Sequence, residues 1–158
     1  MDGLYRSTLN TADIINASTV TLVKGTYTKI GQVVVAADER IGMGYGSADM
    51  QDTANGRIYC DFKDNSGTPV AISGMFRIEM ESSQDMPIGA QPIVIDVDIN
   101  TINQGGTNRT QQIAFPFTNI LLSKDKKFVF YIKNTAGSAQ TLSQANSTCL
   151  VDITRQLV

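Results

Sequence analysis

Ile93-Val-Ile-Asp-Val-Asp-Ile-Asn100 decides the fold class of this chain, because every second residue in it is apolar. Successive side chains of a β-strand leave opposite sides of the pleat, so this pattern indicates a strand with one buried face. The same period of two returns around Ile58, Phe76 and Val151, and no helical stripe of comparable length competes with it. The sequence therefore predicts an all-β protein.

The strand signals divide the chain into about eight strands with uneven connections between them. The predicted strands are Ser18–Val23, Tyr27–Ala36, Arg57–Lys63, Pro69–Glu81, Ile93–Ile102, Arg109–Phe117, Phe128–Lys133 and Thr148–Leu157. Such uneven connections favour an antiparallel eight-stranded β-sandwich of Greek-key, jelly-roll topology over an up-and-down barrel. We expect an N-terminal arm over residues 1–17 and a single jelly-roll domain over residues 18–158.

Three local features refine this prediction. The strands Arg57–Lys63 and Pro69–Glu81 are predicted to form a hairpin around the turn Asp64-Asn-Ser-Gly67, because Asn and Gly accept the positive φ of tight turns. Gly74 indicates a bulge or bend within the second strand. Thr11–Asn16 is compatible with a short helical turn and with an extended arm.

The composition is polar but weakly charged. The 158 residues include 16 Thr, 11 Ser, 10 Asn and 10 Gln, whereas charged residues make up 18% and the net charge is -2. A surface of this kind has a weak electrostatic field, so it favours neither a polyanion nor a membrane surface as a partner. Lys124-Asp-Lys-Lys127 is a basic cluster, which we interpret as a solvated loop rather than a phosphate-binding site.

The residue types disfavour catalysis. The sequence has no histidine, so Ser-His-Asp and Cys-His triads are impossible within this chain. Asp96 with Asp98, and Glu79 with Glu81, stand two residues apart on predicted strands, a spacing that overlaps that of inverting glycosidases. Because polar strand faces often carry such pairs, we interpret them as solvated and expect no catalytic residue and no enzyme activity.

Oxygen-bearing side chains form two candidate calcium groups: Asp96, Asp98 and Asn100, and Asp61, Asp64 and Asn65. Calcium takes six to eight oxygen ligands, and side chains along one flat strand converge poorly on a single ion. Two cysteines without histidine also make a zinc site unfavourable. We therefore expect no metal and no cofactor.

Cys60 and Cys149 both fall on the apolar side of their predicted strands. We interpret them as buried, reduced thiols that act as small hydrophobic side chains. A disulfide between the two strands is the alternative. The sequence leaves this pairing open, because it does not give the Cα separation on which a disulfide depends.

Aromatic residues are scarce for a carbohydrate-binding protein. Aromatics make up 7% of the chain, and tryptophan is absent. Tyr5, Tyr27 and Tyr45 are the candidate exposed platforms, whereas Tyr59 and Tyr131 lie in predicted strands and are expected to pack.

Three further features carry a resemblance: the predicted arm Met1–Ala17, the glycine-rich run Ile41-Gly-Met-Gly-Tyr-Gly46, and a last strand, Cys149–Leu157, at the chain end. Together with the eight-strand pattern, they make the whole chain resemble the single-jelly-roll capsid proteins of viruses. The resemblance is to the double-stranded DNA lineage in particular, whose β-barrels stand upright in the shell. It implies a structural virion protein, a capsid subunit that self-assembles into an icosahedral shell after synthesis in the host cytoplasm.

The resemblance also implies partners, namely further copies of this chain and other virion proteins. Many small RNA-virus jelly rolls carry basic arms, whereas the predicted arm here contains one arginine, Arg6. We therefore expect no direct nucleic-acid binding. The genome would instead be neutralised by another component, such as an internal membrane near the shell or a separate protein.

Two other functions stay open from the sequence. One is a phage-type decoration or tail-associated module that binds a preformed particle as a monomer or trimer. The other is a non-viral β-sandwich that binds a carbohydrate or another ligand, which a thermal shift in a glycan or calcium screen would reveal.

Overall fold

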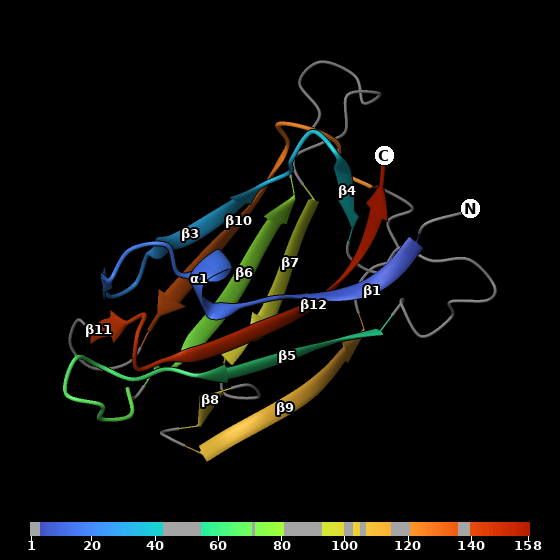
Figure 1. The fold of residues 1–158 in the computed structure, drawn as a ribbon. Coiled ribbons are helices and arrows are strands. Elements are labelled where there is room, and N and C mark those ends of the chain that lie inside the picture. The colour runs from blue at the N-terminus through green and yellow to red at the C-terminus, as the bar shows by residue number, and fades with distance from the viewer. Residues whose placement is uncertain are drawn as a thin grey trace.

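The protein is described here from a computed structural model that covers residues 4–42, 55–70, 72–80, 93–99, 103–104, 107–114, 121–135 and 140–158. These residues form twelve strands and one short helix, and all of the paired strands are antiparallel (Figure 1). The all-β prediction is confirmed.

The first sheet has the strand order β1-β12-β5-β9-β8, and β4 also pairs with β12. Its strands are β1 (Leu4–Leu9), β4 (Glu39–Gly42), β5 (Asn55–Asp61), β8 (Asn103–Gln104), β9 (Thr107–Ala114) and β12 (Thr148–Leu157). The central strand β12 pairs with β1 along one edge and with β5 and then β4 along the other.

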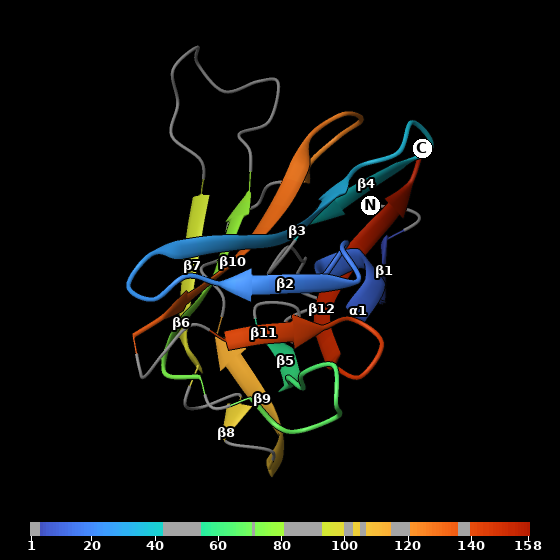
Figure 2. The same cartoon turned by 90° about the vertical axis from the view of Figure 1, so that its left-hand side faces the viewer.

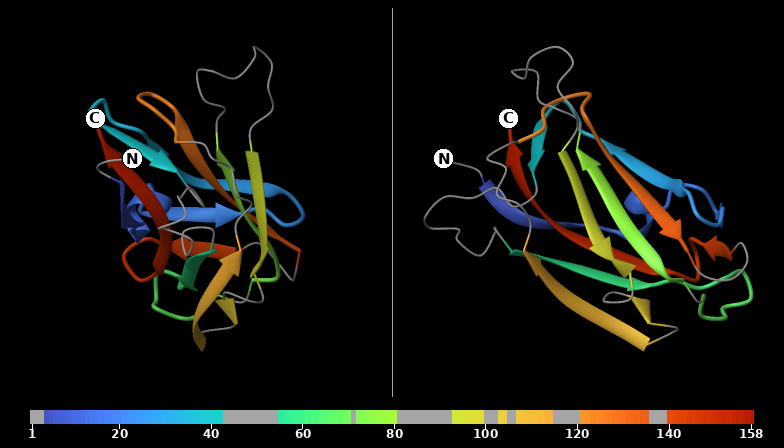
Figure 3. Two further views of the ribbon diagram at one scale, coloured as in Figure 1. Left: turned by 90° about the vertical axis from the view of Figure 1, so that its right-hand side faces the viewer. Right: turned by 180° about the vertical axis from the view of Figure 1, so that it is seen from behind.

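The second sheet has the order β3-β10-β6-β7. Its strands are β3 (Tyr27–Val34), β6 (Gly74–Met80), β7 (Ile93–Asp98) and β10 (Lys127–Asn134). The right-hand view of Figure 3 shows β7, β6 and β10 side by side in this sheet.

A third, two-stranded ribbon consists of β2 (Thr19–Leu22) and β11 (Gln140–Ser143). In the view of Figure 2 it lies between β3 and β5. The N–H of Ser143 donates to the carbonyl of Lys63, just after β5, and the N–H of Gly25 donates to the carbonyl of Asn134 at the end of β10. The ribbon is therefore hydrogen-bonded toward both sheets.

The pairings of the two main sheets are nested along the chain. β1 pairs with β12, β3 with β10, β5 with β9, and β6 with β7. Each pair lies, in sequence, inside the one before it. The first half of the chain therefore runs alongside the second half in reverse order.

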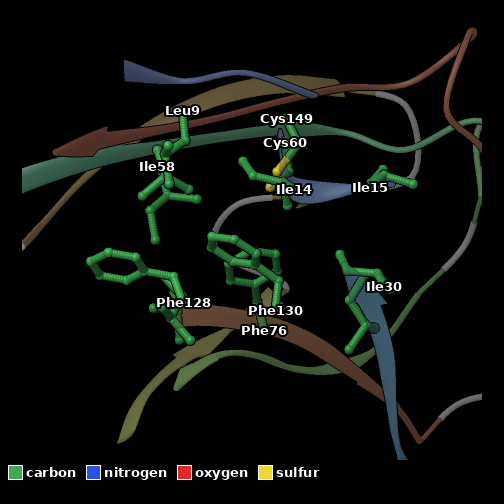
Figure 4. Close-up of a cluster of buried hydrophobic side chains, with 14 of the residues drawn as sticks. Leu9, Ile14, Ile15, Ile30, Ile58, Cys60, Phe76, Phe128, Phe130 and Cys149 are labelled. Carbon is green, nitrogen blue, oxygen red and sulfur yellow. Dashed lines mark hydrogen bonds between the residues drawn. The ribbon is translucent and has the colours of Figure 1, made fainter. Parts of the chain in front are cut away.

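The core fills the space between the two sheets. Figure 4 shows Leu9, Ile58, Cys60 and Cys149 of the first sheet pointing toward Phe76, Phe128 and Phe130 of the second. Their burial follows the predicted alternation: every second side chain of β6 and β10 is buried, as are Cys149, Val151 and Ile153 of β12. The inner faces predicted from the period of two are confirmed at these positions.

Residues 4–15, within the expected arm, lie inside this architecture. β1 adds to the first sheet, and α1 (Thr11–Ile14) follows it as the short helical turn that the sequence allowed. Leu9, Ile14 and Ile15 are fully buried in the same core as the rest of the sandwich. These three apolar side chains anchor the segment.

Four strands were not predicted: β1, β4, β8 and β11. Each has two to six residues, and β4 and β11 lie between predicted strands, where no strand was expected. The expected glycine-rich loop Ile41–Gly46 lies outside the described residues after Gly42, where β4 ends.

The predicted hairpin between Arg57–Lys63 and Pro69–Glu81 is wrong beyond its turn. The turn forms, with the N–H of Asp64 donating to the carbonyl of Thr68 at 2.9 Å. The ladder then stops after Val70, and β6 joins the second sheet between β10 and β7. The chain crosses between the two layers here because the inner face of β6, with Phe76 and Ile78, is buried in the second sheet opposite β5.

Two glycines are required by close backbone approach. Gly74 has a φ of 139°, which only glycine adopts readily, and a Cβ there would meet the carbonyl oxygen of Lys133. This confirms the irregular backbone predicted at Gly74. A Cβ at Gly31 would meet the carbonyl oxygen of Ile14, because α1 lies directly against β3.

Candidate interaction surface

The outer face of the second sheet carries a network of charged and aromatic side chains. We define this outer face by the residues that alternate with the buried ones: Tyr27, Lys29, Gln32, Val34, Met75, Arg77, Glu79, Val94, Asp96, Asp98, Lys127, Val129, Tyr131 and Lys133. The register places them in rows across the sheet, because residues on neighbouring antiparallel strands stand directly opposite one another. The central row consists of Lys29, Tyr131, Arg77 and Asp96.

Arg77 is the centre of this network. Its Nε donates to Oδ1 of Asp96 at 2.8 Å and its Nη2 donates to Oδ2 at 2.9 Å, which is a bidentate pair between β6 and β7. Its Nη1 lies 3.8 Å from Oε1 of Glu79, and its guanidinium carbon lies 3.7 Å from the centre of the Tyr27 ring. The planar guanidinium thus uses both its edge and its face, as arginine can and lysine cannot.

The tyrosines extend the network to β3 and β10. The rings of Tyr27 and Tyr131 meet edge to face with their centres 6.5 Å apart, and the Nζ of Lys133 lies 5.5 Å from the centre of the Tyr27 ring. The Nζ of Lys29 donates to the Oε1 of Gln32 at 2.7 Å. All four strands of the sheet are therefore linked by side chains on this face.

These contacts shift the ionisation of their members. Hydrogen bonding to Arg77 lowers the pKa of Asp96 below its ordinary value, and the same bond raises the pKa of Arg77. Burial, followed by the nearby charge of Asp96, raises the pKa of Tyr27. The outer face carries four basic side chains, Lys29, Arg77, Lys127 and Lys133, and three acidic ones, Glu79, Asp96 and Asp98.

The candidate calcium groups do not converge in the described structure. Asp96 is held by Arg77, and Asn100 lies outside the described residues. Asp64 shapes its own turn by accepting the N–H groups of Ser66 and Thr68, each at 2.9 Å. Within the described ranges, no three His, Cys, Asp or Glu side chains are grouped so as to hold a metal ion.

The other candidate residues are placed as follows. In the carboxylate pairs, Asp98 and Glu79 lie on the outer face, and Glu81 is outside the described residues. Asp61 is nearly buried, with Oδ2 3.6 Å from Nζ of Lys63. In the basic cluster, Lys124 is exposed, Asp125 has a φ of 70°, and Lys127 is the first residue of β10.

Among the tyrosines, Tyr5 is 42% exposed on β1, as expected. Tyr27 is half-buried beneath Arg77, so one face of its ring is covered. Tyr59 and Tyr131 are half-buried in their strands, and Tyr45 lies outside the described residues.

The contacts around Arg77 were not predicted from the sequence. Arg77 and Asp96 each fall on the polar side of a predicted strand, Pro69–Glu81 and Ile93–Ile102, but no local feature of the sequence indicates that these strands pair in the register Arg77↔Asp96. The available signal was the opposite sign of the charges on two strands that follow each other along the chain. Such strands often pair.

The comparisons with known proteins gave distant structural likenesses. No known protein family and no curated protein sequence matches the chain. A crystal structure of the infectious bursal disease virus VP2 subviral particle is 13% identical, with a TM-score of 0.48, over 97% of this chain and 33% of that chain. The Gx strain structure of the same virus is 13% identical with a TM-score of 0.47, over 97% of this chain and 32% of that one.

The T13 viral particle of this virus is also 13% identical, with a TM-score of 0.41, over 99% of this chain and 36% of that chain. The present chain thus spans about a third of the length of these structures. At this identity and these TM-scores the likenesses assign neither a family nor a function. In the described part of the chain, no helix is long and apolar enough to cross a membrane.

Proposed function

We propose that this chain is a single-jelly-roll structural subunit of a virus particle, and that its function is to associate with copies of itself. The nested strand order is the observation that carries this proposal. The four pairs β1:β12, β3:β10, β5:β9 and β6:β7 are those of an eight-stranded antiparallel ribbon folded over into two facing sheets. Such a wrapping is expected of a jelly roll, an architecture of viral capsid and lectin domains, and it therefore supports the proposal.

In this proposal, residues 4–158 make up one domain. β1 supplies the first of the eight nested strands, and β2, β4, β8 and β11 are additions within the connections. A subunit of this kind needs no separate arm in order to close its sheets.

The outer face of the second sheet favours contact between identical copies. Its four basic and three acidic side chains leave a formal net charge of only +1, so two copies of this surface repel each other little through net charge. Contacts between strands also hold the side chains in place, which reduces the entropy lost on binding. The many Thr, Asn and Gln residues of the chain offer further hydrogen bonds without the desolvation of charges.

One contact weighs against a lectin-like role for this face. A sugar ring stacks on an uncovered aromatic face, whereas the guanidinium of Arg77 lies 3.7 Å above the ring of Tyr27. The most aromatic part of the outer face is therefore already in use within the protein.

The finer features of the proposal concern the particle. We place the chain in the virion of the double-stranded DNA lineage, assembled in the host cytoplasm into an icosahedral shell with other virion proteins. A net charge of -2 suits a shell in which another component, such as an internal membrane, lies between this subunit and the genome.

Sedimentation velocity of the purified full chain, over a wide concentration range and several salt concentrations, tests this proposal. We expect concentration-dependent pentamers, hexamers or larger assemblies. Lys29→Glu reverses an exposed charge on the outer face and should weaken assembly, whereas Lys24→Glu, exposed in the turn after β2, is the matched control and should not. A strictly monomeric chain under all of these conditions contradicts the proposal.

A further inference from the structure

Cys60 and Cys149 stand directly opposite each other across the middle of the first sheet. Cys60 lies on β5, Cys149 lies on β12, and the register pairs their Cα atoms. Their Sγ atoms are 3.3 Å apart, although the two residues are 89 positions apart in the sequence. Figure 4 shows both sulfur atoms on the inner side of the sheet, near Ile14.

The backbone hydrogen bonds of Cys149 define the type of pair. Its N–H donates to Oγ1 of Thr11 at 2.9 Å, and the Thr11 hydroxyl donates to its carbonyl at 3.4 Å. Both backbone groups of Cys149 therefore point toward the β1 side and away from β5. Cys60 and Cys149 are thus a non-hydrogen-bonded pair, the narrow type, whose Cα atoms in antiparallel sheets lie about 4.5 Å apart.

That spacing falls within the range for disulfides, whose Cα atoms lie roughly 4.4 to 6.8 Å apart. A small rotation of the two side chains brings the sulfur atoms from contact to the bonding distance of about 2.05 Å. The backbone of β5 and β12 does not have to move for this change.

Burial controls when the two thiols can react. Both side chains are fully buried, and this burial raises the pKa of the Cys60 thiol well above its ordinary value. Because the thiolate is the reactive form, the folded and reduced pair resists oxidants in solution. Reaction is favoured while the chain folds, before β5 and β12 have closed.

We propose that Cys60 and Cys149 are a modification site. Where the chain folds under oxidising conditions, a small-molecule disulfide oxidant forms a cross-strand disulfide that joins β5 to β12, whereas in a reducing cytoplasm both cysteines stay thiols. The thiolate of one cysteine attacks the oxidant disulfide and releases one small thiol. The thiolate of the other cysteine then attacks the mixed disulfide and releases the second small thiol. Two protein thiols lose two protons and two electrons in total, and the oxidant is reduced to two thiols.

The product closes a long loop, because its ends are 89 residues apart. A cross-link of this kind reduces the conformational freedom of the unfolded chain, so the oxidised protein should melt about 5 to 15 °C higher than the reduced protein. The bond would be buried and therefore protected from reductants once the sheet is closed.

The test refolds the full chain from denaturant, either in a mixture of oxidised and reduced glutathione or in reduced glutathione alone. After the oxidising refold we expect a mass lower by two hydrogen atoms, no free thiol in denaturant, a linked peptide containing Cys60 and Cys149, and the higher Tm. The conservative variants Cys60→Ser and Cys149→Ser should instead give the same Tm under both conditions.

Two free thiols in wild-type protein after the oxidising refold would overturn the proposal. A disulfide that lowers the Tm, or an adduct with glutathione in place of the internal bond, would overturn it as well. These readouts on wild-type protein do not depend on the serine variants being able to fold. Adding oxidised glutathione to the folded, reduced protein should form the bond at least tenfold more slowly, and equal rates would contradict control by burial.

Discussion

The two central strands of the molecule, β10 and β12, differ in how regularly their side chains alternate between buried and outward-facing positions. β10 pairs with β3 from Lys127 to Lys133 and with β6 from Phe128 to Asn134. Its side chains alternate between half-buried and buried without a break, although the register against β3 shifts after Phe130. β12 pairs with β1 along one edge from Val151 to Gln156, and along the other edge it pairs with β5 up to Val151 and with β4 from Thr154 onward. At the exchange both Ile153 and Thr154 are buried, so the alternation is interrupted.

This difference shows what the period of two measures. The alternation indicates a strand with one buried face, and it continues along the strand for as long as the same neighbouring strands flank it. Where the partner changes, polar side chains become buried, as at Thr154 and Gln156, and polar contacts fasten the strands. Arg155 does so by donating to Ser7 on β1 at 3.1 Å and to Glu39 on β4 at 2.5 Å.

The largest expected effect is at the inner face of β10. Phe130 is fully buried, with its ring centre 6.3 Å from that of Phe76, so Phe130→Ala should lower the free energy of unfolding by about 3 to 5 kcal/mol. Val129→Ala, at the adjacent half-buried outer position, should cost about 1 kcal/mol or less. Urea denaturation of both variants measures the contrast, and equal losses would mean that β10 does not separate an inner from an outer face.

The next effect concerns the partner exchange along β12. Arg155→Ala removes charged hydrogen bonds to β1 and β4 at partly buried positions and should cost about 1.5 to 3 kcal/mol. A double-mutant cycle with Glu39→Ala isolates the coupling between the two side chains. Arg40→Ala, exposed on the same short strand, is the control and should change stability by about 0.5 kcal/mol or less. Additive losses from Arg155 and Glu39 would show that this pair does not fasten β4.

A third effect lies at the contact of α1, which follows β1 of the first sheet, with β3 of the second sheet. Gly31→Ala places a Cβ against the carbonyl oxygen of Ile14, so either the strand or the helical turn must shift. We expect a loss of about 1 to 3 kcal/mol in denaturant titrations, as for other overpacked sites. A variant as stable as the wild type would show that α1 does not lie against β3.

The smallest effect is on the outer face of the second sheet. Asp96→Asn removes the bidentate ion pair with Arg77 from a partly exposed site and should cost about 1 kcal/mol or less at neutral pH. The folded-state pKa of Asp96 is lowered by Arg77, so its contribution is complete above the unfolded pKa of about 3.9 and is lost as the pH falls through the folded pKa. The stability difference between wild type and variant should be constant from about pH 7 to pH 5 and shrink below about pH 4. A difference of the same size at pH 2 would contradict this assignment.

Local sequence predicted the strands better than it predicted their partners. Thr148–Leu157 and Phe128–Lys133 were placed almost to the residue, because alternation and flanking turn residues are local properties. The predicted pairing of β6 with β5 was wrong. A tight turn at Asp64–Gly67 has the same sequence pattern whether the next strand stays in the same sheet or crosses to the other one.

The site-level features depended on register, which the sequence does not contain. Arg77 and Asp96 meet because β6 and β7 pair at one particular offset, and Cys60 meets Cys149 across 89 residues for the same reason. Short strands such as β4 and β11 have four residues each, too few for an alternating pattern to stand out. Their positions are decided by the neighbouring strands.

Negative-stain electron microscopy of the purified full chain tests the central claim, that this antiparallel β-sandwich is a subunit that associates with itself. At high protein concentration we predict regular, closed multi-subunit particles of uniform size, and we predict that Lys24→Glu forms the same particles. Fields that contain only dispersed single subunits, in every buffer in which the protein is folded, would contradict the account.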